Sequence, residues 1–231
     1  MTRSWWAECM GTGMLLITVV GSGLMAADLS GGNQALALLA NSLATGLMLA
    51  VLITLLAPLS GAHFNPAVTL SLKVSGVGGS PTVWSHVSAQ TVGAIGGVLI
   101  AHLMWSLPPL QWAQQERWGV GLWFSELVAS AGLVFVIVAG ARRNPTQVPW
   151  LVGAYITAAY WFTASTSFAN PAVTVARALT DSFTGIAPAS VWPFVVAQFT
   201  GATAGAFAAK TLFAVAPAVG GSPPMQSASG R

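Results

Sequence analysis

The sequence predicts an all-α integral membrane protein with six transmembrane helices and two re-entrant half-helices. Three observations predict this fold. Only 6% of the 231 residues are Asp, Glu, Lys or Arg, against about 25% in a typical soluble protein. Long apolar stretches separate these charges, and the mean hydropathy is +0.72. The pentapeptide Asn-Pro-Ala-Val-Thr occurs twice, at residues 65–69 and 170–174, which indicates an internal duplication.

The composition also excludes several classes of protein. Hydrophobic residues make up 55% of the chain, so its few charges cannot cover a water-facing surface. A soluble enzyme, a disordered protein and a nucleic-acid binder are therefore excluded. The single cysteine, Cys9, allows neither a disulfide framework nor a thiolate metal site. We expect no catalytic residues, no cofactor, no metal and no nucleic-acid partner.

Apolar segments between the charged residues predict the transmembrane helices, since about 20 apolar residues cross the hydrocarbon of a bilayer. The first segment could also be a cleavable signal peptide, because Met25-Ala26-Ala27 resembles a cleavage site. Its apolar stretch is longer than usual for a signal peptide, however, and five further spans follow it. We expect the six helices near residues 7–27, 35–57, 82–105, 121–140, 148–165 and 190–213.

The basic residues predict the orientation in the membrane. With a cytoplasmic amino terminus, only Arg117 and Arg177 fall outside, and all other basic residues fall inside. Because cytoplasmic loops are rich in Lys and Arg, we expect a multi-pass protein of the cell inner (plasma) membrane with both termini cytoplasmic. Residues 218–231 are rich in Gly, Ser and Pro and are predicted to be a disordered tail.

Three features recur in the same order in the two halves of the chain. They are Glu8 and Glu126, the two pentapeptides, and the pairs Ala89-Gln90 and Ala197-Gln198. Each half contains three crossings, an odd number, so the second half enters the membrane from the opposite side. We expect residues 1–231 to form a single transmembrane channel domain of inverted repeats, at about 5–108 and 119–215.

Each Asn-Pro pair predicts the start of a short helix, because Asn is a preferred N-cap and Pro is preferred at the first helical position. Residues 66–73 and 171–180 are too short to cross the membrane. Residues 60–64 and 166–169 before them are uncharged apart from a histidine. Irregular backbone at membrane depth is tolerated only inside protein or beside a watery cavity. We therefore expect two re-entrant loops that meet near the middle of the bilayer.

The two asparagines carry the expected chemistry. If the side-chain oxygens of Asn65 and Asn170 accept N–H groups of their own helices, their amide nitrogens are held as donors. Those donors would hold water oxygens at the centre of a pore, which breaks a proton wire. The two helix N-termini would oppose cations. An Asn-Pro pair can also be only a helix start, but two symmetric copies favour the pore.

At these residues the chain resembles the aquaporin/aquaglyceroporin (major intrinsic protein) family, over residues 5–215. The resemblance implies a homotetramer. Each protomer would form a right-handed bundle around a central pore that conducts water or small uncharged solutes. It implies that Glu8 and Glu126 support the loops by accepting backbone N–H bonds; the alternative is a pair of interfacial charges at helix ends. The implied motif residues are Asn65, Pro66, Ala67, Asn170, Pro171 and Ala172. The implied pore-lining backbone is that of Gly61, Ala62, His63, Phe64, Thr166, Ser167, Phe168 and Ala169.

In the family, four residues form an outer constriction of the pore. Their distances in sequence from the two asparagines give the equivalent residues of this chain, which are Thr45, Ala158, Ser167 and Val173. Most family members have Arg where this chain has Val173. Four small side chains predict a wide ring without a fixed cation. Arg177 lies one turn further along the same helix face. It either places a cation in the outer vestibule or pairs with Asp181.

A narrower similarity concerns the second half. Residues 170–174, Arg177 and residues 180–188 are similar to a bacterial subgroup found in arsenic-resistance operons. This similarity implies passage of neutral arsenic acids, which resemble small polyols in size and hydrogen bonding.

We therefore expect a passive channel for water, glycerol-like polyols, arsenite and related neutral metalloid acids that excludes protons and ions. A water-selective aquaporin remains an alternative. A secondary transporter shares inverted repeats and broken helices, but it usually carries a carboxylate or base at its site. An intramembrane hydrolase lacks support, because no Gly-x-Ser-x-Gly motif occurs. His63 is expected beside the pore or in a structural loop bond, and His86 and His102 in packing.

Overall fold

The computed structural model describes residues 1–76 and 82–213. This part of the chain contains helices and no strand, which confirms the all-α prediction. The tail expected at residues 218–231 lies outside the described residues. The helices are α1 (Arg3–Leu29), α2 (Gln34–Ser60), α3 (Pro66–Ser75), α4 (Val83–Met104), α5 (Val120–Arg143), the short η1 (Pro145–Gln147), α6 (Val148–Phe162), α7 (Pro171–Arg177) and α8 (Pro188–Leu212).

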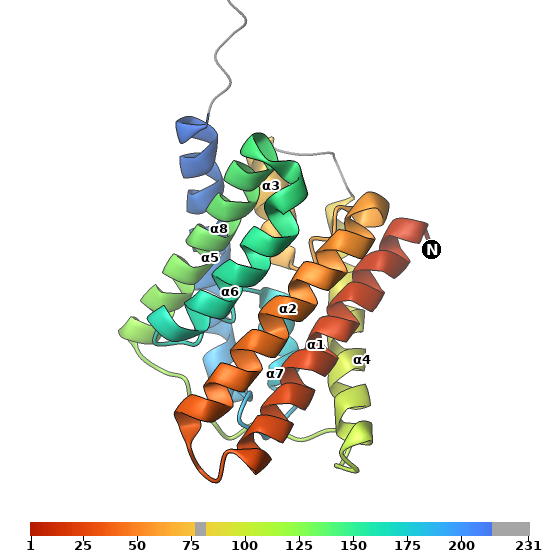
Figure 1. Ribbon diagram of the computed structural model, residues 1–231, viewed down its shortest axis with the longest axis vertical. Helices are drawn as coiled ribbons and strands as arrows, with labels where there is room; N and C mark the ends of the chain where they lie inside the picture. Colours follow the sequence, from red (N-terminus) through yellow and green to blue (C-terminus); the bar gives the residue numbers. More distant parts are fainter. Residues whose placement is uncertain (77–81, 214–231) are drawn as a thin grey trace, which may run out of the picture.

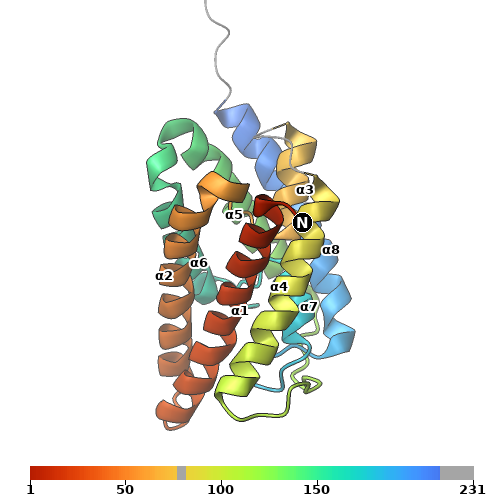
Figure 2. The ribbon, with the colours of Figure 1, turned by 90° about the vertical axis from the view of Figure 1, so that its right-hand side faces the viewer.

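Six long helices surround two short ones. Figures 1 and 2 show α1, α2, α4, α5, α6 and α8 as a bundle, with α3 and α7 extending in opposite directions from its middle. The amino terminus and the end of α8 lie at the same end of the bundle. The connections from α1 to α2 and from α4 to α5 lie at the other end. We call these the terminal end and the loop end of the bundle.

Five helices are long and apolar enough to cross a membrane, namely α1, α2, α4, α5 and α8. The remaining long helix, α6, has 15 residues and ends at Phe162, earlier than the predicted Ser165. The reason lies on α5, where the Ser125 hydroxyl accepts the backbone N–H of Ala164 (3.2 Å) and the Glu126 carboxylate accepts that of Phe168 (2.9 Å). These bonds hold the chain in a loop where a helix would otherwise continue.

The second half-helix is also shorter than predicted. It ends at Arg177 and not at Thr180. The backbone carbonyls of Ala178 and Leu179 instead accept N–H groups of Ala113 and Gln111. The segment between α4 and α5 therefore binds the backbone that would have continued α7.

Glycines allow two pairs of long helices to approach closely. A Cβ atom at Gly93 or Gly97 of α4 would collide with backbone carbonyls of α1, and one at Gly201 or Gly205 of α8 would collide with those of α5. Small residues at helix crossings are typical of membrane bundles. These glycines therefore bring the backbones of α1 and α4, and of α5 and α8, into close contact.

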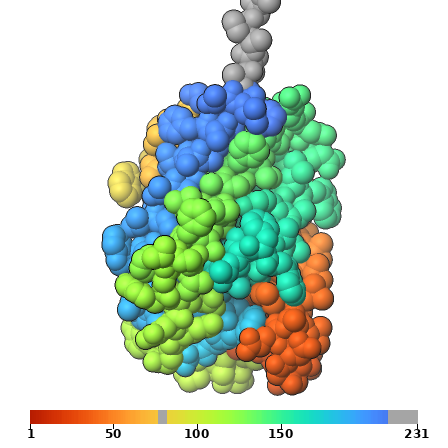
Figure 3. All heavy atoms as spheres, turned by 90° about the vertical axis from the view of Figure 1, so that its left-hand side faces the viewer, coloured from red at the N-terminus to blue at the C-terminus, as the bar shows by residue number. Residues whose placement is uncertain are grey.

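The outer surface of the bundle is apolar. Figure 3 shows the face formed by α5 (green), α6 (teal) and α8 (blue). Large exposed side chains on these helices include Phe124, Trp150, Phe162, Val196 and Phe207. Such a surface suits lipid or a neighbouring subunit.

Candidate functional site

The two half-helices begin at the asparagines, as predicted. The Asn65 side-chain oxygen accepts the backbone N–H of Ala67 at 2.9 Å and that of Val68 at 3.4 Å. The Asn170 oxygen accepts the corresponding N–H groups of Ala172 and Val173 at 3.0 and 3.3 Å. Pro66 and Pro171 are the first helical residues. Both N-termini, with their partial positive charge, therefore lie at the asparagines.

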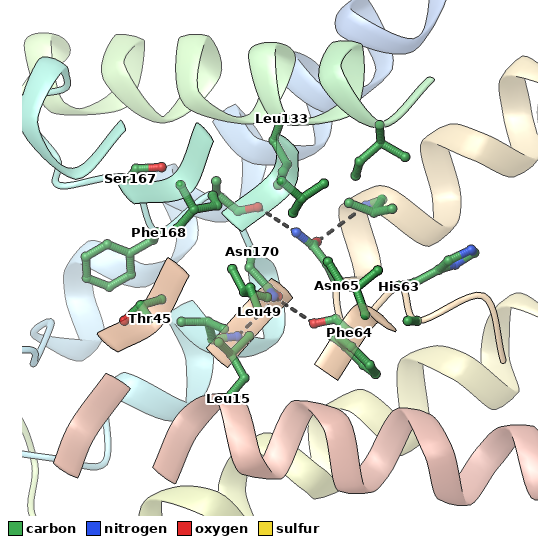
Figure 4. Close-up of a pocket in the computed structure, with 18 of the residues that line it drawn as sticks. Leu15, Thr45, Leu49, His63, Phe64, Asn65, Leu133, Ser167, Phe168 and Asn170 are labelled. Atoms are coloured by element: carbon green, nitrogen blue, oxygen red, sulfur yellow. Dashed lines mark hydrogen bonds between the residues drawn. The ribbon is translucent and has the colours of Figure 1, made fainter. Parts of the chain in front are cut away.

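The asparagine side chains also join the two halves. The amide nitrogen of Asn65 donates to the Ala169 carbonyl at 2.7 Å, and that of Asn170 donates to the Phe64 carbonyl at 2.8 Å. Figure 4 shows these two crossing bonds at the centre of the cavity. An amide has two hydrogens, so each asparagine keeps one for a molecule in the cavity. The sequence did not predict that the other one binds the opposite loop.

The loops before the half-helices have a backbone that side-chain-bearing residues rarely adopt. Positive φ angles occur at Ala62, Phe64, Thr166, Ser167 and Ala169, between 47° and 62°. Such residues cost on the order of 1–3 kcal/mol each and persist only where neighbours hold them. Apart from Thr166, these residues line a shared cavity.

Two fully buried glutamates hold these loops. Glu8 accepts the backbone N–H groups of His63 (3.0 Å) and Phe64 (2.7 Å). Glu126 accepts those of Phe168 (2.9 Å) and Ala169 (2.8 Å). This geometry confirms the expected loop support and excludes the alternative of interfacial charges.

A glutamine amide also donates to each glutamate and to a threonine of the adjacent half-helix, contacts that the sequence did not predict. The Gln90 amide donates to Glu8 at 2.7 Å and to the Thr69 hydroxyl at 3.0 Å. In the second half, the Gln198 amide donates to Glu126 at 2.6 Å and to Thr174 at 2.8 Å. The signal was present, because both glutamines and both threonines recur in step in the two halves. These contacts connect α4 to α3 and α8 to α7.

A single cavity passes the asparagines between the two ends of the bundle. Its apolar wall has residues at four-residue spacing on α2 and α6, with others from α1 and α5. The loop residues that were predicted to line the pore all line this cavity, except Thr166. Pro66, Ala67, Pro171 and Ala172 lie behind the wall. The apolar lining residues on the long helices are Leu15, Val19, Leu49, Ile53, Leu133, Ile137, Val148, Val152 and Ile156.

One of the four residues predicted for the outer constriction does not line the cavity. Thr45, Ser167 and Val173 line the cavity, but Ala158 does not and is exposed. The prediction was wrong because Ile156 and Tyr160, one helical turn apart, face the cavity, which places Ala158 on another side of α6. The Tyr160 hydroxyl donates to the Thr45 hydroxyl at 3.3 Å. Figure 4 shows Thr45, Ser167 and Phe168 on one side of the asparagines and His63 on the other.

Arg177 faces the cavity. It is buried, its Nε donates to the Thr184 carbonyl, and its guanidinium carbon lies 3.4 Å from the centre of the Phe168 ring. Within residues 1–76 and 82–213 it forms no ion pair with Asp181, which instead accepts the backbone N–H of Gln114. Of the two expectations, the structure supports the one that places a cation in the vestibule.

A second buried arginine lies beside it. The Nε of Arg117 donates to the Gly185 carbonyl at 2.9 Å, and its guanidinium carbon lies 4.9 Å from the Phe168 ring centre. Burial lowers the pKa of Arg117 to about 10, so this side chain stays charged at neutral pH. The sequence carries no signal for it, because Arg117 lies in an irregular segment without a repeat partner.

Two of the three histidines, His63 and His86, lie near the terminal end of the cavity. His63 lines the cavity, and its Nδ1 is 3.0 Å from the Thr69 hydroxyl. Both expectations for this residue therefore hold. His86 packs 5.3 Å from the His63 ring, and its Nε2 is 3.1 Å from the Ser60 carbonyl. His102 joins two loops at the opposite end by bonds to Pro109 and Thr180.

A bundle of apolar helices around one cavity, with two half-helix ends and paired amides at its centre, defines a membrane channel. The buried carboxylates of Glu8 and Glu126 are engaged with backbone N–H groups. Comparison with known proteins gives the family. The model of the Major intrinsic protein family matches residues 1–164, and the chain belongs to this family.

Relatives cover most of the chain. It is 54% identical to aquaglyceroporin AqpS of Rhizobium meliloti, over 87% of this chain and 86% of that protein. It is 28% identical to the probable aquaporin NIP7-1 of Arabidopsis thaliana, over 89% and 75%. The solved structure of the aquaglyceroporin from Plasmodium falciparum matches with a TM-score of 0.72 at 18% identity, over 92% of this chain and 96% of that one. This last likeness shows the shared fold.

Proposed function

We propose that this channel conducts water, glycerol-like polyols and small neutral metalloid acids such as arsenite, and that it excludes protons and ions. One observation carries the proposal: Thr45, Tyr160, Ser167 and Val173 line the cavity, and no guanidinium stands at the position of Val173. We take these four residues as the outer constriction. A ring with an apolar side and several hydroxyl groups suits solutes that carry both CH and OH groups. The name of the relative AqpS agrees with such a range.

The centre of the cavity supplies the barrier to protons. One hydrogen of each asparagine amide remains for the oxygen of a passing molecule, so a water there must turn its own hydrogens outward. Its neighbours on the two sides then point in opposite directions, and a proton cannot be relayed along the file. The two helix N-termini add a positive potential that opposes cations.

Passive conduction fits the site better than coupled transport. Coupled transporters usually place an unpaired carboxylate in the substrate path. Here Glu8 and Glu126 are fully buried and engaged with loop N–H groups and glutamine amides. Flux should therefore rise linearly with solute concentration and require no ion gradient.

We also propose a homotetramer in the cell inner membrane with both termini in the cytoplasm. The two ends of the described chain lie at one end of the bundle (Figure 1), and there Arg142 donates to the carbonyls of Lys210 and Phe213. These basic residues suit the cytoplasmic side. The apolar outer face (Figure 3) supports contacts with lipid and neighbouring copies.

Light scattering of proteoliposomes tests the solute range. After an osmotic step with glycerol, vesicles that contain the protein should shrink and then re-swell faster than empty vesicles, and arsenite uptake should rise in parallel. Rapid water flow without glycerol or arsenite entry would support a water-selective channel instead. Saturating flux, or flux that requires an ion gradient, would support a transporter.

A cysteine substitution tests the route. Ser167 lines the cavity, so a mercurial bound at Ser167→Cys should block solute flux almost completely. Cys9 is half-buried and does not line the cavity, so the parent protein should remain open to the same reagent. Equal block of the parent and of the substituted protein, relieved by Cys9→Ser, would contradict this route.

A further inference from the structure

A second cavity opens at the loop end of the bundle, next to the outer constriction. Its volume is about 310 Å³. Arg117 and Arg177 line it together, and Arg177 also lines the central cavity. The other polar lining residues are Gln34, Asn41, Gln115 and Thr166. Its wall therefore offers many hydrogen-bond donors and no carboxylate.

The fold fixes both guanidinium groups in this wall. Their Nε atoms donate to carbonyls of two consecutive residues, Gly185 for Arg117 and Thr184 for Arg177. Both guanidinium groups also lie over the ring of Phe168, an arrangement that stabilises a cation. The two planar groups are therefore positioned before any ligand arrives.

Their outer nitrogens are free to bind a ligand. Within residues 1–76 and 82–213, the Nη atoms of Arg117 and Arg177 form no hydrogen bond to protein. A guanidinium carries five N–H donors, and each side chain uses only the one at Nε. Exposed fractions are 8% for Arg117 and 2% for Arg177, so bulk water cannot surround these groups.

No carboxylate of the described chain neutralises the pair. Asp181 accepts the backbone N–H of Gln114 and is exposed. Glu116 is also exposed and forms no ion pair within the described residues. Glu126 is near enough to act on both arginines, but its two oxygens accept bonds from the loop and from Gln198. Two buried like charges without paired anions are costly.

We propose that this outer cavity is a binding site for a small oxyanion, held by the Nη atoms of Arg117 and Arg177. Planar guanidinium groups bind the oxygens of such ions in pairs, and two of them enclose a tetrahedral ion from two sides. The neutral constriction of Thr45, Tyr160 and Val173 does not offer a charged ion comparable partners. The bound ion therefore stays at the mouth and slows the entry of neutral solutes from that side.

Thermal unfolding of the purified protein in detergent tests the binding without measuring transport. Inorganic phosphate is the probe, with chloride at equal ionic strength as reference. Phosphate should raise the melting temperature in a saturable manner, since a ligand bound only to the folded state stabilises it. Arg117→Gln should raise the apparent Kd by at least about tenfold, which corresponds to roughly 1.4 kcal/mol. Arg3→Gln removes the same charge from an exposed residue near the amino terminus and should leave the Kd unchanged.

A flux measurement provides a second test and rests on the proposed function. Phosphate on the loop-end side of oriented proteoliposomes should slow glycerol entry, and phosphate on the terminal side should not. Arg117→Lys keeps the charge but loses the planar donors, so it should weaken both the thermal shift and the inhibition. Equal thermal shifts with phosphate and chloride, or in the parent and Arg117→Gln, would overturn the proposal. Failure of glycerol conduction alone would instead count against the proposed function.

Discussion

The width of the proposed outer constriction depends on a few side chains. Thr45 and Tyr160 form one side through their hydroxyl contact, and Val173 belongs to the first turn of α7. Arg177 is four residues after Val173, so its charge lies one turn further along the same helix face. The chain therefore has a cation, Arg177, in the vestibule and an apolar residue, Val173, in the proposed constriction.

Val173→Arg should convert the ring to a narrower one. The added guanidinium would fill the space beside Tyr160 and lie near Arg177, and loop carbonyls could accept its N–H groups. Glycerol and arsenite flux should fall by about tenfold or more, the effect of roughly 1.4 kcal/mol on a barrier, and water flux should fall much less. Stopped-flow light scattering on proteoliposomes measures both.

Val173→Met is the matched control for that change, because it adds length without charge. It should reduce glycerol flux less than Val173→Arg does. Unchanged glycerol flux in Val173→Arg, with the protein correctly folded, would show that Val173 does not belong to the constriction.

The residues that could be predicted are those that recur in both halves. Asn65, Asn170, Glu8 and Glu126 were identified from motif and repeat. The structure places both asparagines in the cavity wall and bonds both glutamates to the loops that line it. The prediction that Ala158 lines the constriction was wrong, because a distance in sequence does not determine which side of α6 faces the cavity. Arg117 was missed because tertiary bonds from a loop, not a local pattern, bring it to the vestibule.

At the level of elements, hydropathy and caps predicted the helices but not all of their ends. The starts of α3 and α7 were correct because Asn-Pro encodes them locally. The ends of α6 and α7 were predicted too late. Both are determined by hydrogen bonds from other segments, Ser125 and Glu126 in one case and residues 111–113 in the other. Such contacts are not visible in local propensity.

The crossing of α1 and α4 gives a prediction at this scale. Gly97→Ala would place a methyl group against the Gly13 carbonyl and the Leu16 side chain, and overpacking of this kind costs roughly 1–3 kcal/mol. The melting temperature in detergent should therefore fall. Gly96→Ala is the control from the same helix, since a Cβ there has nothing within 4 Å, and it should be close to neutral. Similar melting temperatures for both variants would contradict the close crossing.

In the whole molecule, the two halves depend on each other. Each half supplies an asparagine amide that binds a loop carbonyl of the other half, while each glutamate supports only the loop of its own half. The centre of the cavity is therefore correct only when both halves are folded and joined. The same two bonds hold the remaining amide hydrogens and both helix N-termini at the centre of the cavity.

This arrangement should make the channel impermeable to protons while it conducts water. Vesicles with a trapped pH dye and an imposed potential should acidify no faster than protein-free vesicles. Asn170→Asp keeps a cap for α7 but replaces the amide donor with a negative charge, so proton leak should rise severalfold or more as the central barrier to cations weakens. Asn33→Asp makes the same change at the exposed cap of α2 and should have no effect. A proton current through the parent protein comparable to its solute flux would refute this account of the central barrier.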